Sequence, residues 1–209
     1  EVPAADFSRY LVVDTGRMPW APPTAGPPPR LEYLPPGSQL VLLARPAEIE
    51  ASDEGRLFLR SLGSEAEAAL GRLADWCGCP PAAIESIQAG WQGGGTDQVI
   101  GGVAIRLTTG RRLPLEEATR KRSWGATRPV TVAGETYYKG QGLSFWVPAD
   151  EDDRVLVVAV EPDAGNHAGP AGLGGSLMED TIRAAIESRD LPEDELAANL
   201  PRDLAVLAG

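Results

Sequence analysis

The sequence has few of the side chains on which most catalytic sites depend. His167 is its single histidine, and its two cysteines, Cys77 and Cys79, are separated by one glycine. A serine or cysteine nucleophile would have to recruit His167, and no Gly-x-Ser-x-Gly elbow occurs. Two sulfurs without further ligands do not complete a tetrahedral zinc site. We therefore expect no metal and no cofactor, and a non-enzymatic protein is favoured over an enzyme.

The cysteine pair is one residue short of the redox Cys-x-x-Cys spacing. It lies where an apolar helical pattern stops, so we expect two small thiols, buried or half-buried, at the end of a helix. A local disulfide formed in an oxidising compartment is the alternative.

Two short motifs point to chemistry that the rest of the sequence does not support. Asp14-Thr15-Gly16 looks like one half of an aspartic-protease site, but no second Asp-Thr-Gly or Asp-Ser-Gly supplies the partner carboxylate. An aspartic-type hydrolase through Asp14 is kept as the least favoured hypothesis. The glycine clusters at 93–102 and 171–175 lack the spacing and the lysine of a nucleotide-binding loop.

Charge and hydropathy exclude further classes. The formal net charge is -11, and an acidic surface field repels phosphate, so no nucleic-acid partner is expected. No run of eighteen apolar residues occurs, and we therefore expect no membrane insertion within this segment.

A basic segment interrupts the acidic chain and is the best candidate for a binding surface. Residues 101–140 hold eight Lys and Arg against three Glu, while residues 141–209 hold fourteen Asp and Glu against four Arg. Arginine beside tryptophan is typical of surfaces that anchor proteins or stack on sugars. We predict a partner, another protein or a glycan, at Arg111, Arg112, Arg120, Lys121, Arg122 and Trp124. The alternative is that these arginines pair with local acids and that the tryptophans belong to the core.

Hydrophobic periodicity divides the chain into an arm and one α+β domain. Residues 19–30 contain six prolines, so residues 1–30 are predicted to form a short strand and a proline-rich extended arm. From residue 31 the pattern predicts a buried strand before Pro46, then helices at 52–62 and 64–77, capped by Ser52 and by a Ser64/Glu67 capping box. A third helix is predicted from Ser176, whose capping box is completed by Glu179.

The remaining patterns predict strands. Ile87 to Leu107 alternates in the manner of an antiparallel pair, and residues 130–160 predict a meander whose last two strands are joined by the acidic turn 148–153. A short polar helix is expected at 115–121. The whole is predicted to be a largely antiparallel sheet with helices mainly on one face. The Leu-Pro phrase at Leu34 returns at Leu200, which makes a repeat or spacer unit of a larger membrane-anchored protein a second hypothesis.

The order of "LPPGSQLVLLARP", "SDEGRLFLRSL", "GCPPAAIESIQAGW", "VIGGVAIRL" and "FWVPADEDDRVLVVAV" resembles that of extracytoplasmic α+β domains in uncharacterised proteins of planctomycete-type bacteria. This resemblance implies a bacterial protein located in the periplasm or at the cell surface, and it supplies no catalytic residues. Taken together with the missing catalytic groups, it favours a non-enzymatic extracytoplasmic interaction or sensory domain.

Overall fold

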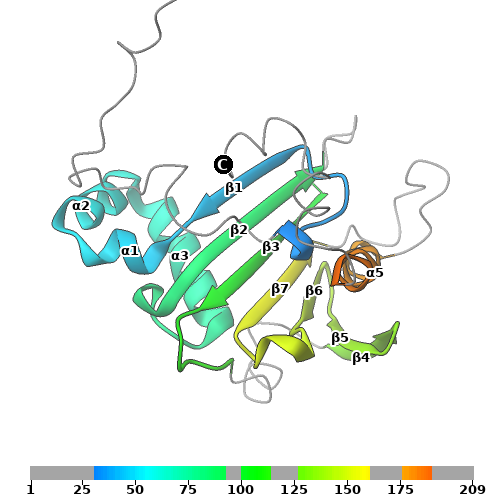
Figure 1. The fold of residues 1–209 in the computed structure, drawn as a ribbon. Coiled ribbons are helices and arrows are strands. Elements are labelled where there is room, and N and C mark those ends of the chain that lie inside the picture. Colours follow the sequence, from blue (N-terminus) through cyan, green and yellow to red (C-terminus); the bar gives the residue numbers. More distant parts are fainter. Residues whose placement is uncertain (1–30, 93–99, 114–126, 161–175, 190–209) are drawn as a thin grey trace, which may run out of the picture.

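Seven strands form one antiparallel sheet in the computed structural model, which describes residues 31–92, 100–113, 127–160 and 176–189. Their order across the sheet is β1-β2-β3-β7-β6-β5-β4 (Figure 1). The strands are β1 (Leu40–Ala44), β2 (Ile84–Gln92), β3 (Ile100–Leu107), β4 (Arg128–Val132), β5 (Glu135–Lys139), β6 (Leu143–Trp146) and β7 (Val155–Val160). The predicted α+β class and the antiparallel sheet are confirmed, and β4 to β7 form the predicted meander.

Four α-helices and three short 3-10 helices accompany the sheet in the described ranges. They are η2 (Leu31–Tyr33), α1 (Pro46–Ala51), α2 (Asp53–Ser61), α3 (Gly63–Cys77), η3 (Pro81–Ala83), η5 (Ala149–Glu151) and α5 (Leu177–Arg189). None of these helices is long and apolar enough to cross a bilayer. The predicted arm at 1–30, the helix at 115–121 and the echo at Leu200 lie outside the described residues.

The central strand β7 is buried on both of its faces, and this decides where the helices pack. Val155 and Val157 join one core cluster with Met178 and Ile182 of α5, whereas Leu156 and Val158 join a second cluster with Cys77 of α3. Successive side chains of a strand point to opposite faces, so α5 and α3 cover opposite sides of the sheet (Figure 1). The predicted arrangement of an antiparallel sheet with packed helices is thus found, and α5 covers the face opposite α3.

Of the N-caps predicted for the first two helices, Ser52 is confirmed and Ser64 is wrong. Ser52 caps α2 as expected, with its hydroxyl accepting a 2.9 Å hydrogen bond from the Gly55 amide. Ser64 does not cap α3, because the left-handed Gly63, with a φ of 81°, turns the chain directly from α2 into α3, one residue before Ser64. Pro46, predicted only to end a strand, also begins α1, since a proline lacks the amide that a first helical turn leaves unused.

Two glycines opposite each other in the sheet allow the segment before β1 to cross close above it. Gly90 of β2 pairs with Gly102 of β3. A Cβ atom at Gly90 would lie 2.5 Å from the Ser38 hydroxyl oxygen, and one at Gly102 would lie 2.8 Å from the ring of Pro35. The glycine pair therefore forms a trough that receives residues 34–38, and this contact fixes the path of the chain into β1.

We predict that Gly102→Ala lowers the free energy of unfolding by about 1–3 kcal/mol, because the added methyl group overlaps the Pro35 ring. Gly71→Ala is the matched control: it lies in α3 with nothing within 4 Å of the point that a Cβ atom would occupy, and removing a helical glycine stabilises by about 0.5–1 kcal/mol. Urea unfolding of both variants checks this. Equal effects of the two substitutions would contradict the trough.

Candidate functional site

A partly buried ion pair connects the segment that precedes β1 to the sheet. Arg106 of β3 donates two hydrogen bonds to the Glu151 carboxylate, at 2.8 and 3.2 Å, and the Tyr33 hydroxyl donates a third at 2.9 Å. The side chains of Arg106 and Glu151 are only 18% and 10% exposed. Glu151 comes from η5, at the end of the acidic turn, and Tyr33 comes from η2. Three segments distant in the sequence thus meet at one carboxylate.

Tyr33 completes this anchor through its ring. Its ring packs edge-on against the buried Trp146, with centroids 5.7 Å apart and an interplanar angle of 70°. Burial, followed by the hydrogen bond to the Glu151 carboxylate and its negative charge, raises the pKa of Tyr33 above its ordinary value of 10.0. Tyr33 therefore stays protonated at neutral pH and acts as a donor, not as a general base.

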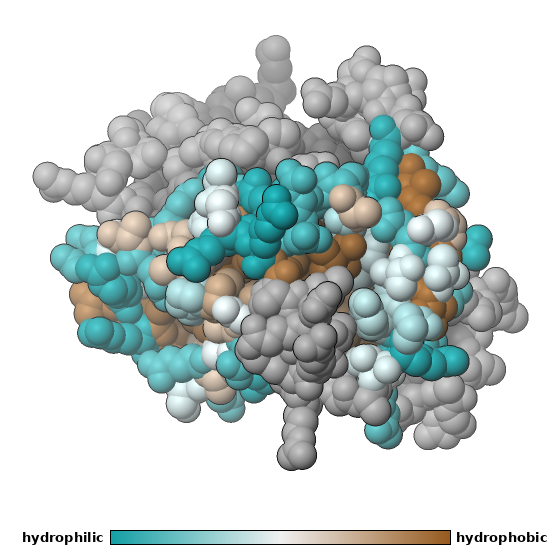
Figure 2. All heavy atoms as spheres, turned by 90° about the horizontal axis from the view of Figure 1, so that it is seen from below, coloured by the Kyte–Doolittle hydropathy of each residue, from teal (hydrophilic) through white to brown (hydrophobic). Residues whose placement is uncertain are grey.

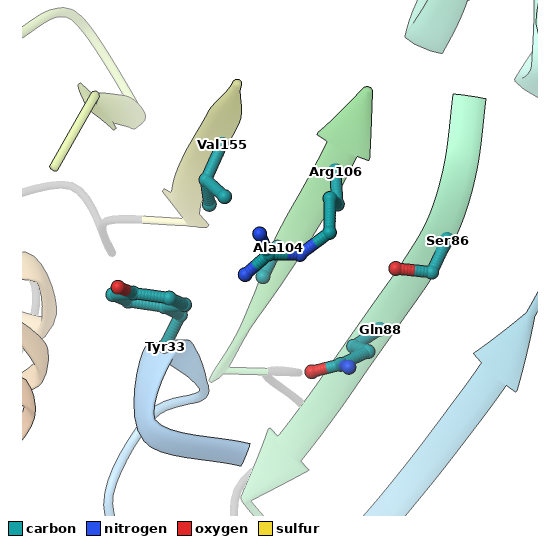
Figure 3. A pocket seen from close by; sticks show the side chains of 6 residues that line it. All are labelled: Tyr33, Ser86, Gln88, Ala104, Arg106 and Val155. Atoms are coloured by element: carbon teal, nitrogen blue, oxygen red, sulfur yellow. The ribbon is translucent and has the colours of Figure 1, made fainter. Parts of the chain in front are cut away.

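A small hollow, partly open to solvent, lies beside the anchor. Its lining residues are Tyr33, Ser86, Gln88, Ala104, Arg106 and Val155. Figure 3 shows the side-chain oxygens of Ser86 and Gln88 pointing from β2 toward the hollow, with the Arg106 guanidinium between them and Tyr33. Gln88 is 7% exposed and its Oε1 has no hydrogen-bond partner.

The size and the charge of the hollow limit what it can do. Its volume of about 10 Å³ is far below the roughly 300–1,000 Å³ of ordinary ligand pockets and leaves room for about one water molecule. The positive charge of Arg106 is already matched by Glu151, and no lining side chain is an activated nucleophile or a general base. A bound water would satisfy the Gln88 oxygen. The anchor is thus structural, and the described residues give this hollow no reaction chemistry.

The strand β1 is the most unusual surface in the described part of the chain. Its side chains Leu40, Leu42 and Leu43 are 63%, 50% and 44% exposed. The prediction of a buried strand was wrong, because β1 lies at the edge of the sheet and pairs with β2 alone among the described strands. A continuous apolar run carries no signal in the sequence that distinguishes an edge strand from a buried one.

Further exposed apolar side chains follow β1 in the sequence, at α2. Leu57, Phe58 and Leu62 at α2 are also exposed. Six of the seven exposed large hydrophobic residues found in the described ranges therefore come from one segment, residues 40–62.

The structure places only part of the basic surface predicted from the sequence. Arg111 and Arg112 are exposed and follow β3. Arg120, Lys121, Arg122 and Trp124 lie outside the described residues, so their proximity to this pair stays a prediction. Of the nearby aromatic residues, Trp146 and Tyr137 are fully buried in the core.

The acidic turn has structural partners. Asp150 forms a 2.8 Å ion pair with Arg189 of α5, and Glu151 belongs to the anchor. Among the residues that the structure describes, no group of three or more His, Cys, Asp or Glu is arranged to hold a metal.

The cysteine pair lies where the sequence predicted it, at the end of a helix. Cys77 is the last residue of α3 and is buried, Cys79 is half-buried, and both are free thiols. The predicted half-buried thiols are therefore found, and the alternative of a formed disulfide is not.

No protein-family model matches the chain, and no curated protein and no solved structure matches it either.

We predict that Glu151→Gln lowers the free energy of unfolding by about 2–3 kcal/mol, because it leaves the Arg106 charge buried without its counter-ion. Asp150→Asn is the matched control. Its ion pair with Arg189 is more exposed, so its loss changes the free energy by less than about 1 kcal/mol. Thermal and urea unfolding measure both, and a similar small loss in the two variants would contradict a buried anchor.

The Tyr33 hydroxyl also predicts an alkaline limit of stability. Because folding raises the pKa of Tyr33, its contribution is fully present below the ordinary value of 10.0 and is lost as the pH rises above it. The unfolding free energy should fall above pH 10 more steeply in the wild type than in Tyr33→Phe, with Tyr138→Phe as control. Parallel profiles of wild type and Tyr33→Phe would show that Tyr33 is not responsible.

Proposed function

We propose that this domain is a non-enzymatic interaction module that associates with a second copy of itself through the edge strand β1. The observation that supports the proposal is the cluster of exposed leucines on an edge without a described neighbour. An open edge presents unpaired backbone amides and carbonyls, which favour the addition of another strand.

The sequence of β1 is self-complementary when two copies run antiparallel. A two-fold axis through Leu42 places Leu42 opposite its own copy, Leu40 opposite Ala44, and Val41 opposite Leu43. Every one of these pairs is apolar. In the pair farthest from the axis, the large Leu40 faces the small Ala44. Such directly opposite apolar pairs are the stabilising unit of a sheet.

Charge does not oppose this pairing. β1 contains no charged residue, and extending the register by one residue places Arg45 opposite the neutral Gln39. β4, the other described edge, begins with Arg128 and Pro129. Charged residues and prolines on an edge strand prevent its pairing with another strand. The two edges therefore differ in kind, and β1 is the one suited to association.

The apolar surface of α2 enlarges the area beyond the end of β1. Figure 1 shows β1 running toward α1 and α2, which lie at one side of the sheet. Figure 2, a view from below, shows hydrophobic residues exposed between hydrophilic ones at several places on this face. Exposed apolar patches of this kind mark interaction surfaces in soluble proteins.

Leu42→Lys tests the proposal, because it places two like charges face to face on the proposed axis. Sedimentation velocity over a concentration series should show a weak, concentration-dependent dimer for the wild type, since a five-residue edge buries less than a standard interface. Leu42→Lys should be a monomer. Thr131→Lys, an exposed residue of the other edge, is the matched control and should dimerise like the wild type.

Mixing opposite charges tests the register. Equal amounts of Leu42→Lys and Leu42→Glu should form a mixed dimer, because residue 42 faces its own copy. A wild type that stays monomeric at every concentration would overturn the proposal, and so would two variants that dimerise alone. Dimers of the wild type without the mixed dimer would show that the partner strand is in another register or lies elsewhere.

A location outside the cytoplasm belongs to the same proposal. It is supported by the resemblance of residues 34–209 to extracytoplasmic domains and by no other observation. Association of like domains side by side is also compatible with the second hypothesis, a unit repeated in a larger membrane-anchored protein.

A further inference from the structure

We propose that Cys77 and Cys79 form a thiol–disulfide exchange site whose substrate is an accessible disulfide. The inference goes beyond the interaction function and does not depend on it, because the site lies at the C-terminal end of α3 and not on β1. It rests on the backbone geometry of the Cys-Gly-Cys turn, on the unequal burial of the two sulfurs and on a neighbouring arginine.

The turn that ends α3 brings the two thiols together. Gly78 is left-handed, with a φ of 62° and a ψ of 27°. The Cys79 amide donates to the Ala74 carbonyl at 3.1 Å and the Gly78 amide donates to the Asp75 carbonyl at 3.4 Å. These two bonds define a Schellman motif, which folds the residue after the glycine back over the last helical turn.

The same turn makes a disulfide geometrically accessible. Two peptide steps span at most about 7 Å when the chain is extended, and the left-handed glycine shortens that span. Disulfides need Cα atoms about 4.4–6.8 Å apart. The span of the pair is therefore compatible with a disulfide that leaves α3 folded.

Burial assigns a different role to each sulfur. Cys77 is 1% exposed and packs in the core cluster with Ile84 and Phe145, so a substrate cannot reach it. Cys79 is half-buried at the surface of the same cluster and is within reach. Cys79 is therefore the attacking thiol, and the buried Cys77 resolves the mixed disulfide that Cys79 forms with the substrate.

The surroundings also favour a thiolate at Cys79. The hydrogen bond from the Cys77 thiol, together with the charge of Arg111, lowers the pKa of Cys79 to about 7, although partial burial acts in the opposite direction. The negative C-terminal end of α3 would disfavour a thiolate, but its Ala74 and Asp75 carbonyls are occupied by the Schellman amides. The hydrogen bond to Cys79 and burial raise the pKa of Cys77.

The exchange balances without an outside oxidant. The Cys79 thiolate attacks one substrate sulfur, a Cys79–substrate bond forms, and the substrate disulfide breaks to release one thiolate. The Cys77 thiol then gives its proton to that thiolate and attacks the Cys79 sulfur, which releases the second substrate sulfur as a thiolate. The substrate gains two electrons, and Cys77 and Cys79 end as a disulfide.

A glutathione redox buffer tests this on the full chain, with acid quenching and mass spectrometry. The wild type should form an internal disulfide and no lasting glutathione adduct. Cys77→Ala should accumulate the adduct on Cys79, because the resolving sulfur is missing. Cys79→Ala should form its adduct at least about tenfold more slowly, because Cys77 is buried. Scrambled ribonuclease A, tested in parallel, shows whether protein disulfides are substrates as well as small ones; exchange with either supports the proposal.

Arg111→Gln provides a variant that leaves the core intact. The alkylation rate of Cys79 in the wild type should rise with pH around a midpoint near 7, and the midpoint should move upward in Arg111→Gln. Arg112→Gln is the matched control and should leave it unchanged. Equal adduct formation in the two cysteine variants, a wild type that carries only adducts, or no reaction with either substrate would overturn the proposal.

Discussion

The arrangement of the described chain depends on the carboxylate of Glu151, which accepts hydrogen bonds from both Arg106 and Tyr33. Arg106 belongs to the centre of the sheet and Tyr33 to the segment that precedes β1, so one side chain fixes the distance between them. The glycine trough completes this contact, because Leu34 and Ser38 can approach β2 only where a side chain is missing. Without that close approach the chain could not enter β1 in register with β2.

The position of β1 in turn explains why apolar side chains are exposed in a protein of high net charge. A strand at an edge has one neighbouring strand. Its side chains are buried only where a helix packs over them on one face of the sheet or the other. α3 and α5 pack on opposite faces of the sheet. The core cluster at α5 includes one residue of β1, Val41, and the core cluster at α3 includes one, Ala44. Leu40, Leu42 and Leu43 therefore stay in solvent. The core does not account for their apolar character, and the proposed association through the edge gives them a role.

The sequence predicted the local structure better than the tertiary structure. Periodicity predicted β2, β3 and the meander, and Ser52 predicted the start of α2, because these features depend on neighbours within a few residues. The exposure of Leu42 was missed, since an apolar run has the same appearance in a central and in an edge strand. Arg106 was assigned to a basic segment, and its partner Glu151, 45 positions away, could not be inferred from spacing. A long-range pair of this kind can be predicted only when the order of the strands in the sheet is known.

The Cys-Gly-Cys turn shows how a local signal can be misjudged by comparison with a motif of different length. The standard redox motif places its cysteines three positions apart at the start of a helix, where the helix dipole stabilises a thiolate. Here the cysteines are two positions apart at the end of α3, where the dipole has the opposite sign. In the proposed exchange site the left-handed glycine brings the thiols together, and Cys77 and the charge of Arg111 lower the pKa of Cys79 in place of the dipole. Thiolate chemistry follows from the local field and from access, so neither the spacing nor the helix end by itself excludes it.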